Sequence, residues 1–240
     1  MADRGTAATI LERLLRAQRG MNFEQALEME SLAYSTLLGG AAFRRWLVAR
    51  GDVSSAPIAA PPLQVARDGN TLTLMLNDPA NRNAISAPMR DGLFDILTNA
   101  LDDPTQPHII IKGAGKCFSV GGHLPEFGTA SDLAQAYLIR MERSIARLID
   151  ALRDRCTVHF HGAVIGSGLE VFAAAARCTA MPDTWFQLPE VKMGLIPGAG
   201  GTVTIPRRIG HERALELMLS GKRIGAGQAL DWSLIDEIVG

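Results

Sequence analysis

The stretch HGAVIGSGLEVF (residues 161–172) carries a single carboxylate, Glu170, among glycines, small residues and apolar side chains. The preceding CTVHF (residues 156–160) has the composition of a strand, and the following LEVFAAAAR (residues 169–177) is rich in helix formers. The sequence therefore predicts a strand, a glycine-containing turn, and a helix that begins close to Gly168.

Glu170 has two interpretations at this stage. Ser167 and Glu170 fit the S-x-x-E capping box, in which each side chain satisfies an unpaired amide of the first helical turn. The helix dipole also favours an acid at this position. The alternative is that Glu170 carries out chemistry, and the choice between the two depends on the rest of the chain.

Regular patterns on both sides of this stretch predict mixed α and β structure. Apolar and β-branched runs, and segments with helical periodicity, alternate along the chain. We expect strands at residues 71–77, 108–113, 156–160 and 178–182, and helices at residues 86–101 and 131–153. Strands that alternate with helices indicate a layered α/β fold.

The first fifty residues have a different character, because their apolar residues recur only at helical spacing. A first helix ends before Gly20, Asn22 can cap a second, and Phe43–Arg50 forms either a third helix or a solvated helix with one apolar face. The following segment is rich in Ala, Pro and Ser and shows no period. We therefore expect a helical segment (residues 1–51), an Ala/Pro linker (residues 52–65) and a core (residues 66–240).

Composition narrows the function classes. The net charge is −1 with no basic stripe, so we expect neither nucleic acid nor a membrane surface as a partner. No run of residues is long and apolar enough to span a membrane. Asp3 and Glu12 argue against a transit peptide. Cys117, Cys156 and Cys178 lack CxxC spacing, so we expect buried free thiols, no disulfide, no metal site, and a reducing, cytoplasmic location.

Three glycine-containing loops interrupt the core, at residues 113–124, 161–170 and 195–202. Each could expose backbone amides near the start of a helix, which is how proteins form small anion-holding concavities, and each could equally be only a tight turn. The loop at residues 195–202 lacks the lysine of a phosphate-binding P-loop, and none of the three has a G-x-G-x-x-G pattern between strand and helix. A nucleotide-binding fold is therefore not expected.

In order along the chain, five motifs resemble the crotonase superfamily, the enoyl-CoA hydratase and isomerase group. They are LNDPANRNAIS (76–86), GAGKCFSVGGHLPEF (113–127), HGAVIGSGLEVFAAAARC (161–178), FQLPEVKMGLIPGAGGT (186–202) and ALDWSLIDEIVG (229–240). The resemblance extends from about residue 66 to the last residue. It implies an α/β, crotonase-like ββα spiral core, here preceded by a helical N-terminal segment.

The same resemblance implies an active site. Two backbone amides form an oxyanion hole for a thioester carbonyl in this family, and the matching positions are Gly122 and Ser167. Hydratases of the family also use two glutamates, which match Glu170 and Glu190. Such amides would stabilise an enolate-like transition state more than the ground state.

The implied activity is hydration of a 2-enoyl-CoA thioester, with Glu170 activating the water and Glu190 handling the proton at the α-carbon. Two alternatives stay open: a Δ3,Δ2-enoyl-CoA isomerase that works with Glu190 alone, and a non-catalytic acyl-CoA-binding subunit. The resemblance implies no metal or redox cofactor. Coenzyme A is not counted as a cofactor here, because it is part of the acyl-CoA substrate. Asn83 and Ala84 match the element whose neighbourhood lines the CoA adenine site, although turn chemistry explains the asparagine equally well.

The chain departs from the family pattern at two positions. Ser167 stands where glycine is usual, which puts the substrate range in doubt. His123 replaces a common aspartate, and we expect it to order its loop rather than transfer protons. We interpret His161 as a strand-end residue.

The N-terminal segment resembles the C-terminal helices of family members, which usually continue beyond the point where this chain ends. Residues 26–51 combine an acid-rich helix with an aromatic and basic run, as that family tail does. We therefore expect a circular permutation that places these helices over the acyl-CoA site, in a homotrimer or a dimer of trimers. The alternative is an unrelated helical extension.

Overall fold

The structure is a computed structural model that describes residues 5–240, so Asp3 lies outside the described range. Its centre is a six-stranded sheet with the strand order β1-β2-β3-β4-β6-β9, in which only the β1–β2 pair is antiparallel. The strands are β1 Leu63–Asp68, β2 Thr71–Leu76, β3 His108–Gly113, β4 Cys156–Phe160, β6 Arg177–Ala180 and β9 Glu237–Ile238. A smaller sheet contains β5 Ala163–Ile165, β7 Trp185–Gln187 and β8 Ile224–Gly225.

The parallel strands follow from their β-branched and apolar sequences. Leu72 of β2 pairs with Ile109 of β3, and Leu74 pairs with Ile111. Ile109, Ile111 and Val158 are fully buried, as expected for parallel strands whose faces are covered by other elements. The predicted strands at 71–77, 108–113 and 156–160 are confirmed, and the one predicted at 178–182 is β6, which starts and ends earlier.

Helices cover the sheets. Those that follow β2 in the chain are α4 Ala87–Asp102, α5 Leu133–Glu142, α6 Ile145–Ala151, α7 Ser167–Glu170, α8 Gly201–Ile209, α9 His211–Ser220 and α10 Ala226–Asp231. The prediction of one continuous helix over residues 131–153 is wrong. The chain breaks after α5 because Ser144 caps a new helix, its hydroxyl accepting from the amide of Arg147 at 3.3 Å.

The helix predicted to begin close to Gly168 is confirmed in its start, at Ser167, but it does not continue through the helix formers of residues 169–177. α7 is four residues long, and a 3-10 turn at Phe172–Ala174 leads directly into β6. Arg208 of α8 explains the early end, because its guanidinium donates to the carbonyl oxygens of Ala173 (3.1 Å) and Ala175 (3.0 Å). A continuing helix would need those carbonyls for its own hydrogen bonds.

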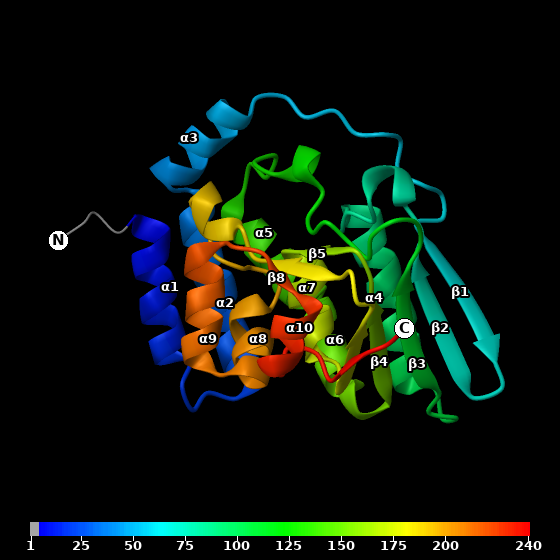
Figure 1. Ribbon diagram of the computed structural model, residues 1–240. Helices are drawn as coiled ribbons and strands as arrows, with labels where there is room; N and C mark the ends of the chain where they lie inside the picture. The colour runs from blue at the N-terminus through cyan, green and yellow to red at the C-terminus, as the bar shows by residue number, and fades with distance from the viewer. Residues whose placement is uncertain (1–4) are drawn as a thin grey trace.

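Three helices form the N-terminal part: α1 Thr6–Ala17, α2 Phe23–Leu38 and α3 Ala41–Arg50. The predicted cap at Asn22 is confirmed, since it forms a reciprocal capping box with Gln25. Figure 1 shows α1 and α2 beside α8 and α9, so that residues distant in sequence pack together. Residues 51–62 contain no helix or strand and run across the top of that view to β1.

The three cysteines are buried and free, as predicted. Burial raises the pKa of the Cys156 and Cys178 thiols to about 12. Across residues 5–240, no helix combines the length and apolarity that crossing a bilayer requires.

Candidate active site

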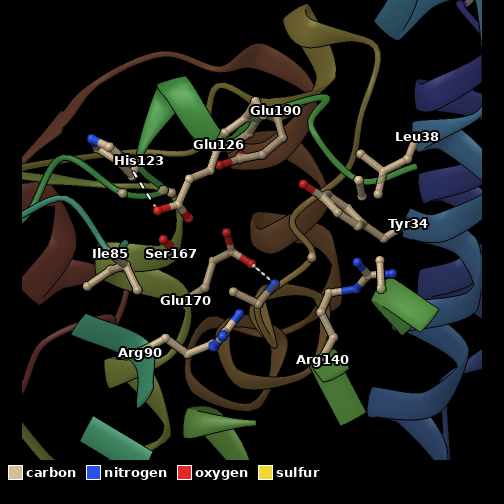
Figure 2. A pocket seen from close by; sticks show the side chains of 18 of the residues that line it. Tyr34, Leu38, Ile85, Arg90, His123, Glu126, Arg140, Ser167, Glu170 and Glu190 are labelled. Carbon is tan, nitrogen blue, oxygen red and sulfur yellow. Dashed lines mark hydrogen bonds and ion pairs between the residues drawn. The ribbon is translucent and has the colours of Figure 1, made fainter. Parts of the chain in front are cut away.

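A cavity of about 670 Å³ lies between the N-terminal helices, α5 and the glycine-containing loops of the core. Apolar side chains of α2, α3 and α5 form one side of it. The opposite side carries the residues on which the family resemblance places the chemistry: Gly122, Ser167, Glu170 and Glu190. Figure 2 shows both glutamates directed into this space.

The amide of Gly122 is available to a ligand because of how the loop pairs with Ile85. The Ile85 amide donates to the Gly121 carbonyl oxygen at 2.7 Å, and the His123 amide donates to the Ile85 carbonyl oxygen at 3.4 Å. These flanking bonds turn the Gly122 N–H to the other side, where no acceptor among residues 5–240 binds it. Gly121 adopts φ +89°, and a Cβ there would lie 2.7 Å from the Ile165 carbonyl oxygen.

The amide of Ser167 is the second free donor. Ser167 is the first residue of α7, and the amides of Leu169 and Glu170 are the first to bond to the Gly166 carbonyl oxygen. The Ser167 N–H is therefore one of the unpaired donors of a helix start, with no acceptor in the described chain. Gly166 has φ +50°, and a Cβ there would lie 2.7 Å from Oε1 of Glu190.

The capping box predicted for Ser167 and Glu170 is wrong. The N-cap residue of α7 is Gly166, and no side chain caps this helix. Ser167 Oγ is buried and has no hydrogen-bond partner within residues 5–240. Glu170 does bind amides of a helix start, but they belong to the start of α8 and not to its own helix.

Glu170 is held by one oxygen only. Its Oε2 accepts from the amides of Ala199 at 2.8 Å and Gly201 at 3.1 Å, while Oε1 has no partner in the part of the chain that is described. The residue is 2% exposed, and burial raises its pKa to about 7, opposed by the amides of the 198–201 turn. Glu170 can thus ionise near neutral pH and offer a free oxygen to the cavity.

Glu190 lies in a less favourable setting for a negative charge. Its Oε2 is buried without a hydrogen-bond partner among the described residues. Burial, then the charge of Glu170, then that of Glu30 raise its pKa well above the ordinary value. Two amides stabilise a negative charge on Glu170, and no described residue donates to Oε2 of Glu190, so Glu170 is the better placed of the two to act as the base.

Glu30 of α2 is a third buried carboxyl group, which sequence reasoning missed. Its Oε1 accepts from the Gly200 amide at 2.7 Å, and its Oε2 accepts from the amide and hydroxyl of Thr202 at 2.7 and 2.8 Å. Burial and the charge of Glu170 raise its pKa to about 8. The available signal was its position on the apolar stripe of α2, between Leu27 and Tyr34.

Tyr34 of α2 also points into the cavity, with its hydroxyl directed toward the two glutamates in Figure 2. Its ring packs against Gly198, where a side chain would collide with it, and lies over the Arg140 guanidinium at 5.1 Å. Burial raises its pKa above the ordinary value, so the hydroxyl remains a hydrogen-bond donor. From the sequence, Tyr34 was recognised only as one of the helically spaced apolar residues of the second helix.

His123 has a local partner. Its Nδ1 lies 3.3 Å from Oε1 of Glu126, and Glu126 in turn accepts from the Ala87 amide at 3.1 Å. Nε2 of His123 is buried without a partner in the described residues. This arrangement fits the predicted loop-ordering role, because it joins the Gly122 loop to the start of α4. His161 lies at the end of β4, where its Nε2 contacts the Gly115 carbonyl oxygen at 3.1 Å.

Asn83 and Ala84 do not line the cavity. The Asn83 amide group donates to the carbonyl oxygens of Ala114 (2.8 Å) and Cys117 (3.0 Å), and its oxygen accepts from the Asp78 amide at 2.9 Å. The geometry thus accounts for Asn83 as a turn residue, and contact with a CoA adenine stays a prediction. Within residues 5–240, no three His, Cys, Asp or Glu side chains are grouped as a metal ion would require.

The family described as "Enoyl-CoA hydratase/isomerase" matches residues 67–240, and the chain belongs to this family of the crotonase superfamily. It is 33% identical over 174 residues to the enoyl-CoA isomerase/hydratase fer4 of Mycosarcoma maydis, covering 69% of this chain and 64% of that protein. It is 31% identical to a trans-2-decenoyl-[acyl-carrier-protein] isomerase of Streptococcus mutans, covering 71% and 66%. The matched part therefore spans slightly less than two thirds of these relatives.

Solved structures agree with the fold. The enoyl-CoA hydratase of Thermoplasma volcanium has a TM-score of 0.68 and 33% identity, with 75% of this chain and 72% of that chain covered. The enoyl-CoA hydratase of Bacillus anthracis also has a TM-score of 0.68, with 28% identity over 74% and 70% of the two chains. The chain thus has a crotonase-like α/β fold, as predicted.

Proposed function

We propose that the protein hydrates a 2-enoyl-CoA thioester. The observation that carries this proposal is the unequal pair of carboxyl groups, Glu170 and Glu190, which face one cavity beside two unpaired backbone amides. Hydration needs both a base and an acid, and groups whose environments separate their proton affinities can take these roles at one pH.

In the proposed reaction, the thioester oxygen accepts hydrogen bonds from the amides of Gly122 and Ser167. The free oxygen of Glu170 removes a proton from water as that water bonds to the β-carbon, and the double-bond electrons move to the thioester oxygen as an enolate. Collapse of the enolate takes the proton of Glu190 to the α-carbon. The net change is addition of H and OH, and proton exchange between the two carboxyl groups and solvent restores the site.

A second candidate is Δ3,Δ2-enoyl-CoA isomerisation, in which Glu190 alone moves a proton between carbons. The observation that favours it is the anchoring of Glu170 to the amides of Ala199 and Gly201, which gives this residue a structural role independent of water activation. The names of the relatives include both hydratase and isomerase.

Incubation with crotonyl-CoA separates these candidates, because hydration removes the absorbance of the enoyl thioester whereas crotonyl-CoA offers no 3-enoyl bond to an isomerase. We expect loss of absorbance and formation of 3-hydroxybutyryl-CoA. A protein that converts only 3-enoyl-CoA substrates would support isomerisation. Binding without turnover of either substrate class would contradict both reactions and favour an acyl-CoA-binding subunit.

Substitution of Ser167 by glycine should retain hydration within about tenfold and admit bulkier acyl groups. The oxyanion donor is the main-chain N–H, which glycine keeps, and the buried Oγ has no hydrogen-bond partner to lose in the described chain. Relative kcat/KM for crotonyl-CoA and branched 2-enoyl-CoA substrates measures this. A folded variant without activity would mean that the hydroxyl itself takes part in the reaction.

The N-terminal helices belong to the proposed site, so deletion of residues 1–52 should abolish turnover and expose apolar surface. Leu11, Leu14 and Leu27 are buried in the common core, and Glu30 and Tyr34 would be lost from the cavity. Binding of a hydrophobic dye, CoA-thioester affinity and mass in solution measure the effect. A soluble deletion variant with unchanged substrate affinity and mass would contradict the proposed permutation and the trimer-based assembly.

A further inference from the structure

Residues 199–202, the turn that leads into α8 together with the first two residues of that helix, bind two carboxyl groups in alternation. The amides of Ala199 and Gly201 donate to Glu170, and the amides of Gly200 and Thr202 donate to Glu30. Successive N–H groups therefore point to opposite sides of the same short segment.

Glu30 has further support from the N-terminal helices. The Thr202 hydroxyl donates to Glu30, and the same hydroxyl accepts from Nε2 of Gln18 at 3.0 Å. Nε2 of Gln18 also donates to the Ala26 carbonyl oxygen at 2.8 Å. A continuous hydrogen-bond network thus joins the end of α1 and the first half of α2 to the turn that holds Glu170.

No basic side chain within residues 5–240 forms an ion pair with Glu30, although Glu30 is only 1% exposed. A buried acid in this position carries a desolvation cost that an amide or apolar side chain would not carry. The hydrogen bonds that Glu30 accepts at the N-terminus of α8 offset part of this cost. They also orient the turn, because the Gly200 amide must face Oε1 of Glu30 and the Thr202 amide must face Oε2.

We propose that Glu30 is a positioning residue for Glu170: it fixes the 199–202 turn so that Ala199 and Gly201 hold Oε2 of Glu170 and leave Oε1 free for water. This inference rests on the proposed hydration for its functional meaning. Its geometric content, that Glu30 sets the bonds received by Glu170, can be measured without turnover.

The substitution Glu30→Gln tests the proposal. Glutamine has nearly the same shape, but its NH₂ group cannot accept from a backbone N–H, so one of the two amides loses its acceptor and the turn rotates. We expect the ¹H–¹⁵N signals of Ala199 and Gly201 to move toward values typical of weaker hydrogen bonds in the folded variant. We expect kcat for hydration to fall about 10- to 100-fold, with KM changed less than about threefold.

Glu28→Gln is the matched control, because Glu28 lies on the same helix, is exposed, and contacts the Tyr137 hydroxyl at 3.1 Å instead of the turn. It should leave the two amide signals and kcat unchanged. If Glu30→Gln does not fold, Thr202→Val decides in its place, since it keeps the Thr202 amide and removes the hydroxyl that donates to Glu30 and accepts from Gln18. The same changes, smaller in size, are expected from it.

Unmoved Ala199 and Gly201 signals in the folded variant would overturn the proposal whatever the activity. Moved signals with an unchanged kcat would overturn it as well, because catalysis would then not depend on the position of the turn. Failure of the proposed function gives a different result: the unsubstituted protein would not hydrate crotonyl-CoA, while the amide signals would still respond to Glu30→Gln.

Discussion

Under the proposed function, Glu190→Gln should lower crotonyl-CoA hydration by about 10²- to 10⁴-fold, the usual contribution of a general acid or base. The substitution keeps the volume of the side chain and removes its transferable proton. It should cost no stability, because Oε2 of Glu190 has no hydrogen-bond partner in residues 5–240 and burial already disfavours its charge. Steady-state kinetics together with a thermal unfolding curve measure both expectations.

The pH dependence of hydration tests the roles of Glu170 and Glu190 more specifically. Glu170 must be ionised to act as the base, and its pKa is raised to about 7, so hydration should increase as the pH rises through that value. Glu190 must be protonated to act as the acid, and its pKa is raised well above the ordinary value, so hydration should decrease once the pH is high enough to ionise it. We expect a bell-shaped profile, whose alkaline limb is absent from the residual activity of Glu190→Gln.

Glu170→Gln is the companion variant and separates the two candidate reactions. If the protein is a hydratase, this variant loses hydration to a similar extent. If it is an isomerase, Glu170→Gln retains isomerisation of a 3-enoyl-CoA while Glu190→Gln does not. Near-normal hydration by Glu170→Gln would contradict the two-glutamate assignment.

Gly122→Pro should remove hydration almost completely. Proline has no N–H, and the loss of one oxyanion donor alone costs about 10²- to 10³-fold in kcat. A Cβ at this position would also lie 2.7 Å from the Phe127 ring, so a steric effect must be separated from the loss of the amide.

A Phe127→Leu background provides that separation, because the shorter side chain makes room for the new Cβ. Gly122→Ala in this background keeps the amide and should retain most of the activity of Phe127→Leu alone. Gly122→Pro in the same background should remain inactive although crotonyl-CoA still binds. Equal activity of the alanine and proline variants would show that the Gly122 amide does not hold the thioester oxygen.

Sequence reasoning succeeded where a structural preference is local. The strands at 71–77 and 108–113 follow from runs of β-branched and apolar residues, and the cap at Asn22 follows from a residue and its neighbour three positions later. Both kinds of signal act over a few residues. The family motifs extended this reach by bringing Gly122, Ser167, Glu170 and Glu190 into one predicted site, and the structure places all four around one cavity.

Sequence reasoning failed where a residue's conformation or contacts depend on a hydrogen-bond partner that is distant in the sequence. The helix expected after Gly168 ends early because Arg208, more than thirty residues later, takes its carbonyl groups. The S-x-x-E pattern suggested a cap, but Glu170 binds amides 29 and 31 residues away. Glu30 was missed for the same reason, since its partners, Gly200 and Thr202, lie 170 and 172 residues further along the chain.

The two free amides share a feature with an evolutionary consequence. Each donor follows a glycine with positive φ: Gly121 precedes Gly122, and Gly166 precedes Ser167. Because every amino acid except proline carries a main-chain N–H, the identity of the donor residue is free to drift and adjust the shape of the pocket. The preceding glycine has no such freedom, because it sets the direction in which the amide points. Inheritance of this chemistry therefore depends on the backbone direction set at Gly121 and Gly166 more than on the donor side chains, and Ser167 is an example of variation that such an arrangement permits.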